Sequence, residues 1–375
     1  MIEIREIEPT RGNLKKFTQF QIDLYKGNDC YVPPLITDDV NTLDPRRNPA
    51  FDFCESAYFM AYRDGKPVGR IAAIINRQVN LKQGEHVCRF GFVDFIDDDE
   101  VSAALFKAAA DWGRSKGMDT LVGPLGFTDL DHEGMLVDGF DELSTMATIY
   151  NYPYYPVHLE KLGFKQANEW LEFVMDVPDA IPDKYNRIAE IVKKKFGLRV
   201  LKYTSRKRIK EEYGHALFEL INEAYADLYG YSTLTPRQID YYVDQYISLL
   251  NLDLVTLVVD REDKLVGVGI SMQSMSRALQ KSRGRLFPFG WIPLLKGLKG
   301  KNDRVDLLLV AVKPEYQSKG VNALLFQDLI PHYQRLGFKW AESNPEMADN
   351  AKVQSQWEYF KRRQHRRRIA VSKKI

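Results

Sequence analysis

Cysteine is scarce in this chain of 375 residues, with only Cys30, Cys54 and Cys88. Their spacing matches no metal-binding pattern, and an odd, sparse set of thiols argues against a disulfide framework. We therefore expect reduced cysteines in a cytoplasmic protein. Strong charge of one sign is also absent, because the net charge is only +2. The overall charge argues neither for nor against binding to nucleic acid.

Long hydrophobic runs are missing as well. The longest apolar stretch, Leu286–Leu298, is interrupted by Pro288, Gly290, Pro293 and Lys296. It is too short for a membrane-spanning helix, which needs about 20 apolar residues. Residues Met1–Glu8 alternate apolar and charged side chains, unlike a signal peptide. We expect no membrane span and a cytoplasmic location.

What the sequence does contain is an internal repeat of element order. In each half, the patterns predict a strand, a helix, a hairpin of two strands, a further strand, a second helix ending at a glycine, and a last strand. In the first half we expect these at Glu3–Ile7, Gly12–Tyr25, Ala57–Ile75, Arg89–Ile96, Glu100–Lys116 and Thr120–Val122. In the second half we expect them at Leu198–Tyr203, Lys207–Leu228, Leu254–Met272, Arg304–Val312, Val321–Leu336 and through Trp340.

The length and the repeat together predict two domains. We expect the boundary in the proline-bracketed stretch near Val177–Lys184, which gives domains 1–178 and 179–375. The predicted fold class is α/β (α+β), with a mixed, mainly antiparallel sheet flanked by helices in each domain. The second copy contains an insertion, Arg277–Asn302, of basic and apolar residues. Three interpretations of it are open: it admits an acyl chain, touches a membrane surface, or covers the sheet.

The segment between Val312 and Ala323 joins a predicted strand directly to a predicted helix. A glycine at such a junction allows a tight turn, and the first helical turn offers N–H groups and the positive end of the helix dipole. Lys319 adds a positive charge beside this turn. We predict a phosphate-binding loop here; the alternative is an ordinary strand-to-helix turn.

This loop, Gln317-x-x-Gly320-x-Asn322, resembles the Gln/Arg-x-x-Gly-x-Gly/Ala motif that binds the acyl-CoA pyrophosphate in the GNAT superfamily. Asn322 departs from that motif. Further segments are similar to a bacterial group of two-domain GNAT proteins: Tyr31–Leu35, Asp64–Ala73, Gly123–Phe127, Tyr150–Tyr155 and Gly284–Trp291. The resemblance implies an N-acyltransferase that uses acetyl-CoA or another acyl-CoA to modify a small-molecule or peptide amine. It also implies a set of cofactor-binding residues: Leu309, Val310, Ala311, Val312, Gln317, Ser318, Lys319, Gly320, Val321, Asn322, Ala323 and Asn350.

The same resemblance suggests catalytic groups. A backbone amide within Leu309–Val312 would polarise the thioester carbonyl, and Glu342 would accept the amine proton through water. The alternative for Glu342 is a structural salt bridge. The thiolate acid is expected seven residues after Asn350, where Trp357 stands, so Tyr359 is the remaining candidate unless it serves packing. Asn350 would bind the pantetheine arm or cap a helix.

The equivalent junction in the first half carries Asp97–Glu100. These acids favour the start of a helix but repel a pyrophosphate, so we expect no CoA site there. Four residues of an aromatic run are candidates for an acceptor pocket, with domain packing as the alternative: Tyr150, Asn151, Tyr154 and Tyr155. The cluster Asp129, Asp131, His132 and Glu133 lacks a strong ligand spacing, so a solvated loop is favoured over a metal site and no metal is predicted.

Two other functions stay open. A transferase that uses aminoacyl-tRNA, similar to FemX, would contact tRNA through the basic run Lys361–Arg368. That run precedes Ile369–Val371, which we expect to form the last strand of the second domain. A protein that binds acyl-CoA without catalysis would explain the departures at Asn322 and Trp357.

Overall fold

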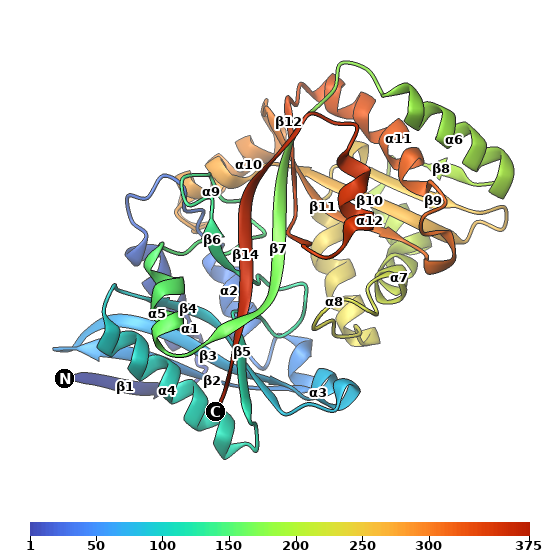
Figure 1. Ribbon diagram of the computed structural model, residues 1–375. Helices are drawn as coiled ribbons and strands as arrows, with labels where there is room; N and C mark the ends of the chain where they lie inside the picture. Colours follow the sequence, from blue (N-terminus) through green and yellow to red (C-terminus); the bar gives the residue numbers. More distant parts are fainter. The chain divides into compact units, whose positions relative to one another are not determined.

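The computed structural model describes the backbone of residues 1–375 and all side chains except those of residues 248 and 352. The chain forms two compact units (Figure 1), which we describe separately. Unit 1 comprises Met1–Leu171, Met275–Leu298 and His365–Ile375, and unit 2 comprises Glu172–Ser274 and Lys299–Gln364. The compact units are therefore interleaved along the chain, unlike the contiguous division at residues 178 and 179.

The sheet of unit 1 follows the predicted order. Its first four strands pair antiparallel in sequence: β1 (Ile2–Ile7), β2 (Cys54–Arg63), β3 (Lys66–Asn76) and β4 (Val87–Phe95). The short strand β5 (Thr120–Gly123) runs parallel to β4. The C-terminal end of β14 (Arg362–Lys374) then pairs antiparallel with β5, with Val371 opposite Gly123, and β6 (Met135–Asp138) also pairs with β14.

The expectation that Ile369–Val371 completes the second domain was wrong. In the structure Val371 pairs with β5 and packs in the main core of unit 1. Alternation of apolar residues predicts a strand, but it does not specify which sheet edge the strand joins. The sheet edge beside β5 accepts this strand although the chain reaches it only at its C-terminal end.

Both faces of the unit 1 sheet are covered, because successive β2 residues point to opposite sides. Phe59 and Ala61 pack with α4 (Asp99–Ser115), whereas Tyr58 and Met60 pack with α1 (Arg11–Leu24) and α2 (Ile36–Leu43). The remaining helices of this unit are α3 (Arg77–Gln83), α5 (Tyr154–Lys161), α9 (Ser276–Ser282) and most of α10 (Trp291–Lys299). The hairpin turn at Asp64–Gly65 has φ values of 51° and 75°, as its sequence predicts.

Unit 2 repeats the strand order of unit 1. Its antiparallel strands are β8 (Arg199–Leu201), β9 (Val255–Val259), β10 (Leu265–Gln273) and β11 (Arg304–Val312). Strand β12 (Trp340–Ser343) is parallel to β11, and the end of β7 (Lys165–Asp176) pairs antiparallel with β12. The repeat and the mixed, mainly antiparallel fold class are thus confirmed.

Two helices pack together on one face of the unit 2 sheet, α6 (Asp183–Phe196) and α11 (Val321–Leu336) (Figure 1). Helix α7 (Arg206–Ala224) packs on β10 and β11, and α8 (Pro236–Tyr246) packs on α7. Short helix α12 (Ala351–Gln354) and strand β13 (Glu346–Met347) precede β14. Within the part of the chain that the structure describes, every helix is too short or too polar to cross a membrane.

Candidate functional site

The junction between β11 and α11 forms a strained loop in unit 2. A short 3-10 turn, Pro314–Tyr316, leads into it, and the Gln317 side-chain amide donates to the Val312 carbonyl at 3.1 Å. Ser318 has φ of 59°, which is uncommon for a residue other than glycine, and Gly320 has φ of 86°. Such backbone strain is typical of ligand-binding loops because the fold must hold it in place.

The first turn of α11 is open to an anion. Gly320 is the N-cap residue and supplies no side-chain acceptor, and the first turn contains no acidic residue. Three preceding side chains, Gln317, Ser318 and Lys319, are exposed. Lys319 forms no ion pair with any residue whose side chain the structure describes. The N–H groups and the dipole of this helix therefore present a positive site of the kind that binds phosphate.

Gly320 also lies close to α6. A Cβ atom at this position would come 2.6 Å from Cγ2 of Ile188, and the left-handed backbone already disfavours any other residue. The loop and α6 are thus tightly packed, and the glycine is required both for the turn and for this contact.

Strands β11 and β12 separate next to the loop. Their parallel pairing covers Arg304–Leu307 and Trp340–Ser343, after which the Asn344 side-chain amide donates to the Leu308 carbonyl at 2.6 Å. Farther along β11, the Tyr225 hydroxyl donates to the Val310 carbonyl at 2.9 Å. In an antiparallel strand the N–H and C=O of one residue point to the same side. The Val310 N–H therefore also faces the edge that β12 leaves.

A narrow apolar cavity lies between this part of the sheet and α11. Its lining includes apolar side chains from β10, β11, α11 and the segment after α12: Ile270, Leu307, Val310, Leu325, Phe326, Leu329, Ile330, Trp357 and Phe360. Asn322 and Gln356 are polar members of the lining, and the Asn322 amide donates to Gln356 at 2.9 Å. The Asn322 side chain is thereby held by Gln356.

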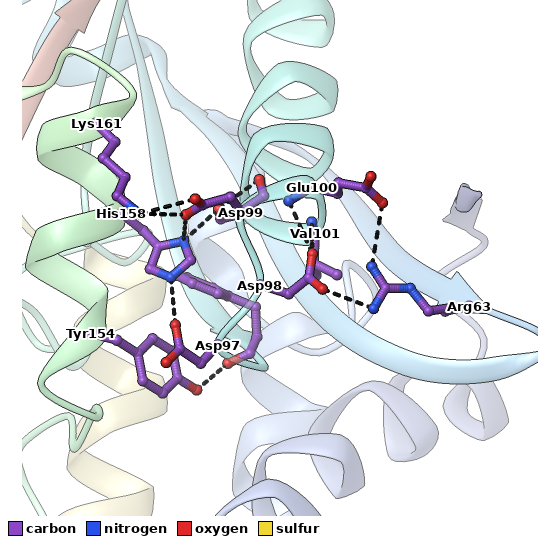
Figure 2. A network of polar contacts seen from close by, with 11 residues as sticks. Arg63, Asp97, Asp98, Asp99, Glu100, Val101, Tyr154, His158 and Lys161 are labelled. Carbon is purple, nitrogen blue, oxygen red and sulfur yellow. Dashed lines mark hydrogen bonds and ion pairs between the residues drawn. The ribbon is translucent and has the colours of Figure 1, made fainter.

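The corresponding junction in unit 1, between β4 and α4, is already filled (Figure 2). Asp98 caps α4 and accepts from the backbone N–H groups of Glu100 and Val101 at 3.0 and 3.2 Å. Arg63 binds the carboxylates of Asp98 and Glu100 at 2.8 and 3.4 Å. The amides that would hold a phosphate thus have an internal partner, which adds to the predicted charge repulsion.

His158 of α5 completes this network in unit 1. Its ring nitrogens contact Asp97 and the Ser102 hydroxyl, both at 2.8 Å, and Lys161 binds Asp99 at 2.9 Å (Figure 2). Strands β4 and β5 of unit 1 also stay together. Beyond the end of their parallel pairing, the Leu125 N–H donates to the Phe90 carbonyl at 2.8 Å. Unit 1 therefore lacks both features that unit 2 offers, an uncapped helix start and a separated strand edge.

Comparison with solved structures identifies this architecture. The chain superposes over its full length on 98% of a tandem GNAT protein from the clavulanic acid biosynthesis pathway, with a TM-score of 0.58 and 13% sequence identity. The fold is that of the tandem GNAT proteins. A crystal structure of a GCN5-related N-acetyltransferase from Sphaerobacter thermophilus, 95% of which is covered, gives a TM-score of 0.50 at 11% identity.

Among curated proteins, two are similar over most of their length. "Protein YghO" of Escherichia coli (strain K12) is 28% identical over 84% of this chain and 80% of its own length. "Bacterial ceramide synthase" of Caulobacter vibrioides is 28% identical over 82% of this chain and 80% of its own length. No family model matches the chain.

The predicted catalytic residues of unit 2 occupy distinct positions. Glu342 is buried on β12, with its carboxylate 3.7 Å from the Arg304 guanidinium. Tyr359 is 47% exposed, and the Lys184 ammonium lies 3.8 Å from its ring centre. Asn350 caps α12 by accepting from the Val353 N–H at 3.2 Å. The structure thus brings none of these three side chains together.

Glu346 is a titratable group that the sequence patterns missed. Its carboxylate accepts from the indole N–H of Trp357 at 2.7 Å, and burial raises the pKa of Glu346 to about 7. Trp357 in turn lines the apolar cavity. The two-residue strand that carries Glu346 is too short for a periodicity signal, and only the bond from Trp357 places the glutamate beside the cavity.

The predicted acceptor residues lie in unit 1. The Tyr155 hydroxyl contacts that of Tyr25 at 2.9 Å and accepts from the Phe95 N–H at 3.1 Å. Further internal bonds join Tyr150 to Phe140, Asn151 to Leu136 and Tyr154 to Phe95. The polar groups of this set are engaged within their own unit, and their role in an acceptor pocket stays a prediction.

The acidic cluster at residues 129–133 and the basic run Lys361–Arg368 both contain buried charged groups that their composition does not suggest. Asp131 accepts from the N–H groups of Phe127 and Thr128, and burial raises its pKa to about 6. Among the described side chains, no three acidic, histidine or cysteine groups are placed to hold a metal ion.

Arg366 and Arg368 are fully buried, and Arg366 donates to the Leu143 carbonyl at 2.6 Å. The basic run is therefore not a continuous solvated surface.

Proposed function

We propose that this chain is an acyl-CoA-dependent N-acyltransferase whose donor binds unit 2. The main support is the difference between two equivalent helix starts. The N-terminus of α11 is uncapped and lacks acids, whereas that of α4 is capped by Asp98 and bears further acids. Only the first fits a pyrophosphate.

Binding of the donor is assigned to the loop and the adjacent strand. The N–H groups of Val321 and Asn322, with the Lys319 ammonium, would hold the pyrophosphate, whereas the Ala323 N–H already donates to the Gly320 carbonyl at 3.0 Å. Gln317, Ser318 and Gly320 shape the loop, and the open edge of β11 at Leu309–Val312 would bind the pantetheine amides. Asn350 stays a candidate for the pantetheine arm, although its side chain now caps α12. These features suit acetyl-CoA and longer acyl-CoA donors equally.

Acyl transfer needs a polarised carbonyl and an amine that loses a proton. The Val310 N–H, on the edge that β12 leaves, would donate to the thioester oxygen. Glu346 would accept the amine proton, since a carboxylate with a pKa near 7 is half ionised at neutral pH. Glu342 stays a candidate for the base in place of Glu346. Tyr359 stays the candidate acid that protonates the departing thiolate.

One relative and the apolar cavity both favour a long-chain acceptor amine. One relative is named a ceramide synthase, and a ceramide is an amide between a fatty acid and a long-chain amine. The cavity beside α11 is narrow and apolar, which suits an alkyl chain better than a polar group. We therefore propose a long-chain amine as acceptor ahead of a small polar amine or a peptide amine.

Transfer from aminoacyl-tRNA is the weaker alternative. The basic run that would contact tRNA contributes two buried arginines to unit 1, so less charge is available for phosphate. Acyl-CoA binding without catalysis is the other alternative, and the assay below separates it from turnover.

The test is release of the CoA thiol by the purified protein. Acetyl-CoA and palmitoyl-CoA would each be offered with a sphingoid-type amine, a polyamine and a peptide. We expect amine-dependent release that is fastest with the sphingoid-type amine. Binding of acyl-CoA without release for any amine would contradict catalysis. Acylation of the amine from aminoacyl-tRNA, with free tRNA formed and no CoA thiol released, would contradict acyl-CoA as the donor.

A further inference from the structure

The segment Met275–Leu298 of unit 1 ends in an exposed aromatic loop. Phe287 is 78% exposed, Phe289 72% and Trp291 44%, and Leu295 on the following helix is 45% exposed. We call these four side chains the aromatic tip. Large apolar side chains are rarely left in water in such a group, so the tip indicates a contact surface.

The base of this segment is firmly attached to unit 1. Gln280 of α9 donates to the backbone carbonyls of Asp29 and Tyr31, both at 2.9 Å. The Gly284 carbonyl accepts from the Ile36 N–H at 2.9 Å, and a Cβ on Gly284 would come 2.3 Å from the Pro34 carbonyl oxygen. The segment therefore has a fixed base, and its apolar residues are exposed only at the far end.

The aromatic tip itself is a compact loop. The Trp291 N–H bonds to the Leu286 carbonyl at 2.9 Å, and its indole N–H bonds to the Pro288 carbonyl at 3.1 Å. At Gly290 any Cβ would overlap the Arg285 carbonyl oxygen, at 1.7 Å. These contacts keep the loop compact, and the rings of Phe287, Phe289 and Trp291 stay exposed on it.

Every charged side chain within the segment that carries the aromatic tip is basic. No aspartate or glutamate occurs between Lys264 and Asn302, although the chain has 51 acidic residues. Five exposed basic residues of unit 1 lie in this stretch: Arg277, Lys281, Arg283, Arg285 and Lys296. None of the five forms an ion pair with the side chains that the structure describes. Their charge is therefore available to an anionic partner.

We propose that the aromatic tip and these five cations dock unit 1 onto an anionic lipid bilayer. Phe, Trp and Leu at a polar interface, surrounded by Lys and Arg, are the composition of segments that insert shallowly among lipid headgroups. A second copy of the chain is disfavoured as the occupant, because a two-fold contact would bring like charges together. This docking does not depend on whether unit 2 transfers an acyl group.

The first experiment is flotation of the full chain with lipid vesicles. We expect the protein to float with vesicles of phosphatidylglycerol and phosphatidylcholine, and to bind less to phosphatidylcholine alone. Binding should weaken as salt is added, because exposed charges are screened. A parent protein that stays with the soluble fraction at low salt, or self-associates through this segment instead, would overturn the proposal.

Two variants locate the contact. Phe287→Ser with Phe289→Ser should lower the vesicle partition coefficient by about tenfold or more, since two apolar side chains no longer enter the interface. Leu81→Ser is the matched control, because Leu81 is 86% exposed in the same unit but outside the segment. If the double variant floats as well as the parent and the Leu81 control, the aromatic tip is not the contact.

The charge contribution has its own pair of variants. Lys281→Gln with Lys296→Gln should weaken binding to anionic vesicles by about 30-fold, because each charge near the surface contributes roughly 1 kcal/mol, and should reduce its salt dependence. Lys194→Gln with Lys195→Gln removes the same charge from exposed positions on α6. Equal loss of binding in both variants would show a general charge effect and would contradict a docking surface in this segment.

Discussion

Glu346 and Trp357 form a pair in which an indole N–H satisfies one carboxylate oxygen. The other oxygen, Oε2, is buried without a hydrogen-bond partner among the described residues. A carboxyl group in this state retains its proton to higher pH, because the charged form is poorly solvated. The group is thus suited to exchange a proton near neutral pH beside the apolar cavity.

Replacing Glu346 by Gln tests the assigned base. The amide keeps the acceptor for Trp357 but cannot take a proton, so we expect kcat to fall by about 100-fold or more. In the parent, kcat/KM should rise through pH 7 as Glu346 ionises. That rise should vanish in the variant. If Glu342→Gln removes the rise and Glu346→Gln does not, the base is Glu342.

Glu346→Gln should lower activity but raise the free energy of unfolding at alkaline pH. The folded pKa of Glu346 is raised from 4.5 to about 7, so the folded state binds more protons than the unfolded state between these values. The contribution of Glu346 to the free energy of unfolding of the parent is therefore largest below pH 4.5. Up to about 3 kcal/mol of it is lost as pH rises through 7. Urea unfolding should show the Gln variant more stable than the parent at about pH 8, with little difference at pH 4.5. A variant less stable than the parent under the alkaline condition would contradict the burial of this carboxyl group.

Gly320 and Gly337 bracket α11 and both adopt left-handed backbone, so they form a matched pair. A Cβ atom on Gly337 would meet no other atom within 4 Å, whereas one on Gly320 would meet Ile188. Gly337→Ala should therefore destabilise by about 1 kcal/mol through its backbone alone. Gly320→Ala should destabilise by about 1–3 kcal/mol more and weaken acyl-CoA binding. Thermal melting measures the stability of both variants, and titration with acyl-CoA measures their binding. Equal destabilisation by the two substitutions would contradict the packing of Gly320 against α6.

Strand β14 shows at the element scale how one basic run serves two environments. Lys361, just before it, is exposed and pairs with Asp176, whereas Arg368 is fully buried and donates to the Gly134 and Ile149 carbonyls. The sequence run is uniform, but alternation along the strand turns every second side chain inward. Two charges of this element, those of Arg366 and Arg368, are therefore structural, whereas Arg362 and Arg363 stay exposed.

Truncation of each basic residue distinguishes these environments. Arg368→Ala leaves buried carbonyls without a donor, so we expect a loss of about 3 kcal/mol in the free energy of unfolding. Lys361→Ala removes the same charge from a surface pair and should change stability by less than about 1 kcal/mol. Chemical denaturation measures both. Similar small effects would mean that Arg368 is not buried in solution.

Elements with strong periodicity were predictable from sequence. The bounds of β11 and α11 agree with the structure, and α4 differs by one residue at each end. Helix α8 was missed although Thr235 and Gln238 form a capping box at its start. The edge joined by β14 was mispredicted because long-range pairing leaves no local pattern.

The candidate site was predictable only in part, for the same reason. The loop from Gln317 to Asn322 is local, so its position between strand and helix followed from the sequence. The burial of Glu346 and the cap that Asn350 gives to α12 depend on how the chain folds around them. Neither leaves a spacing that a single sequence reveals.

At the scale of the whole molecule, two units share one topology and differ in what occupies the same junction. In unit 1 the cap from Asp98, the network around His158 and the bond from Leu125 close the positions that unit 2 leaves open. In the proposed function, unit 2 binds the donor and unit 1 has no donor site, although the two units share one strand order. The molecule should therefore hold one donor site, not two.

The most direct test is calorimetric titration of acetyl-CoA into the full chain. We expect one site per chain, with binding weakened by Gly320→Ala and unchanged by Asp98→Ala, which alters only the junction in unit 1. Two equivalent sites, or binding that is weakened by Asp98→Ala and not by Gly320→Ala, would contradict the assignment of the donor site to unit 2.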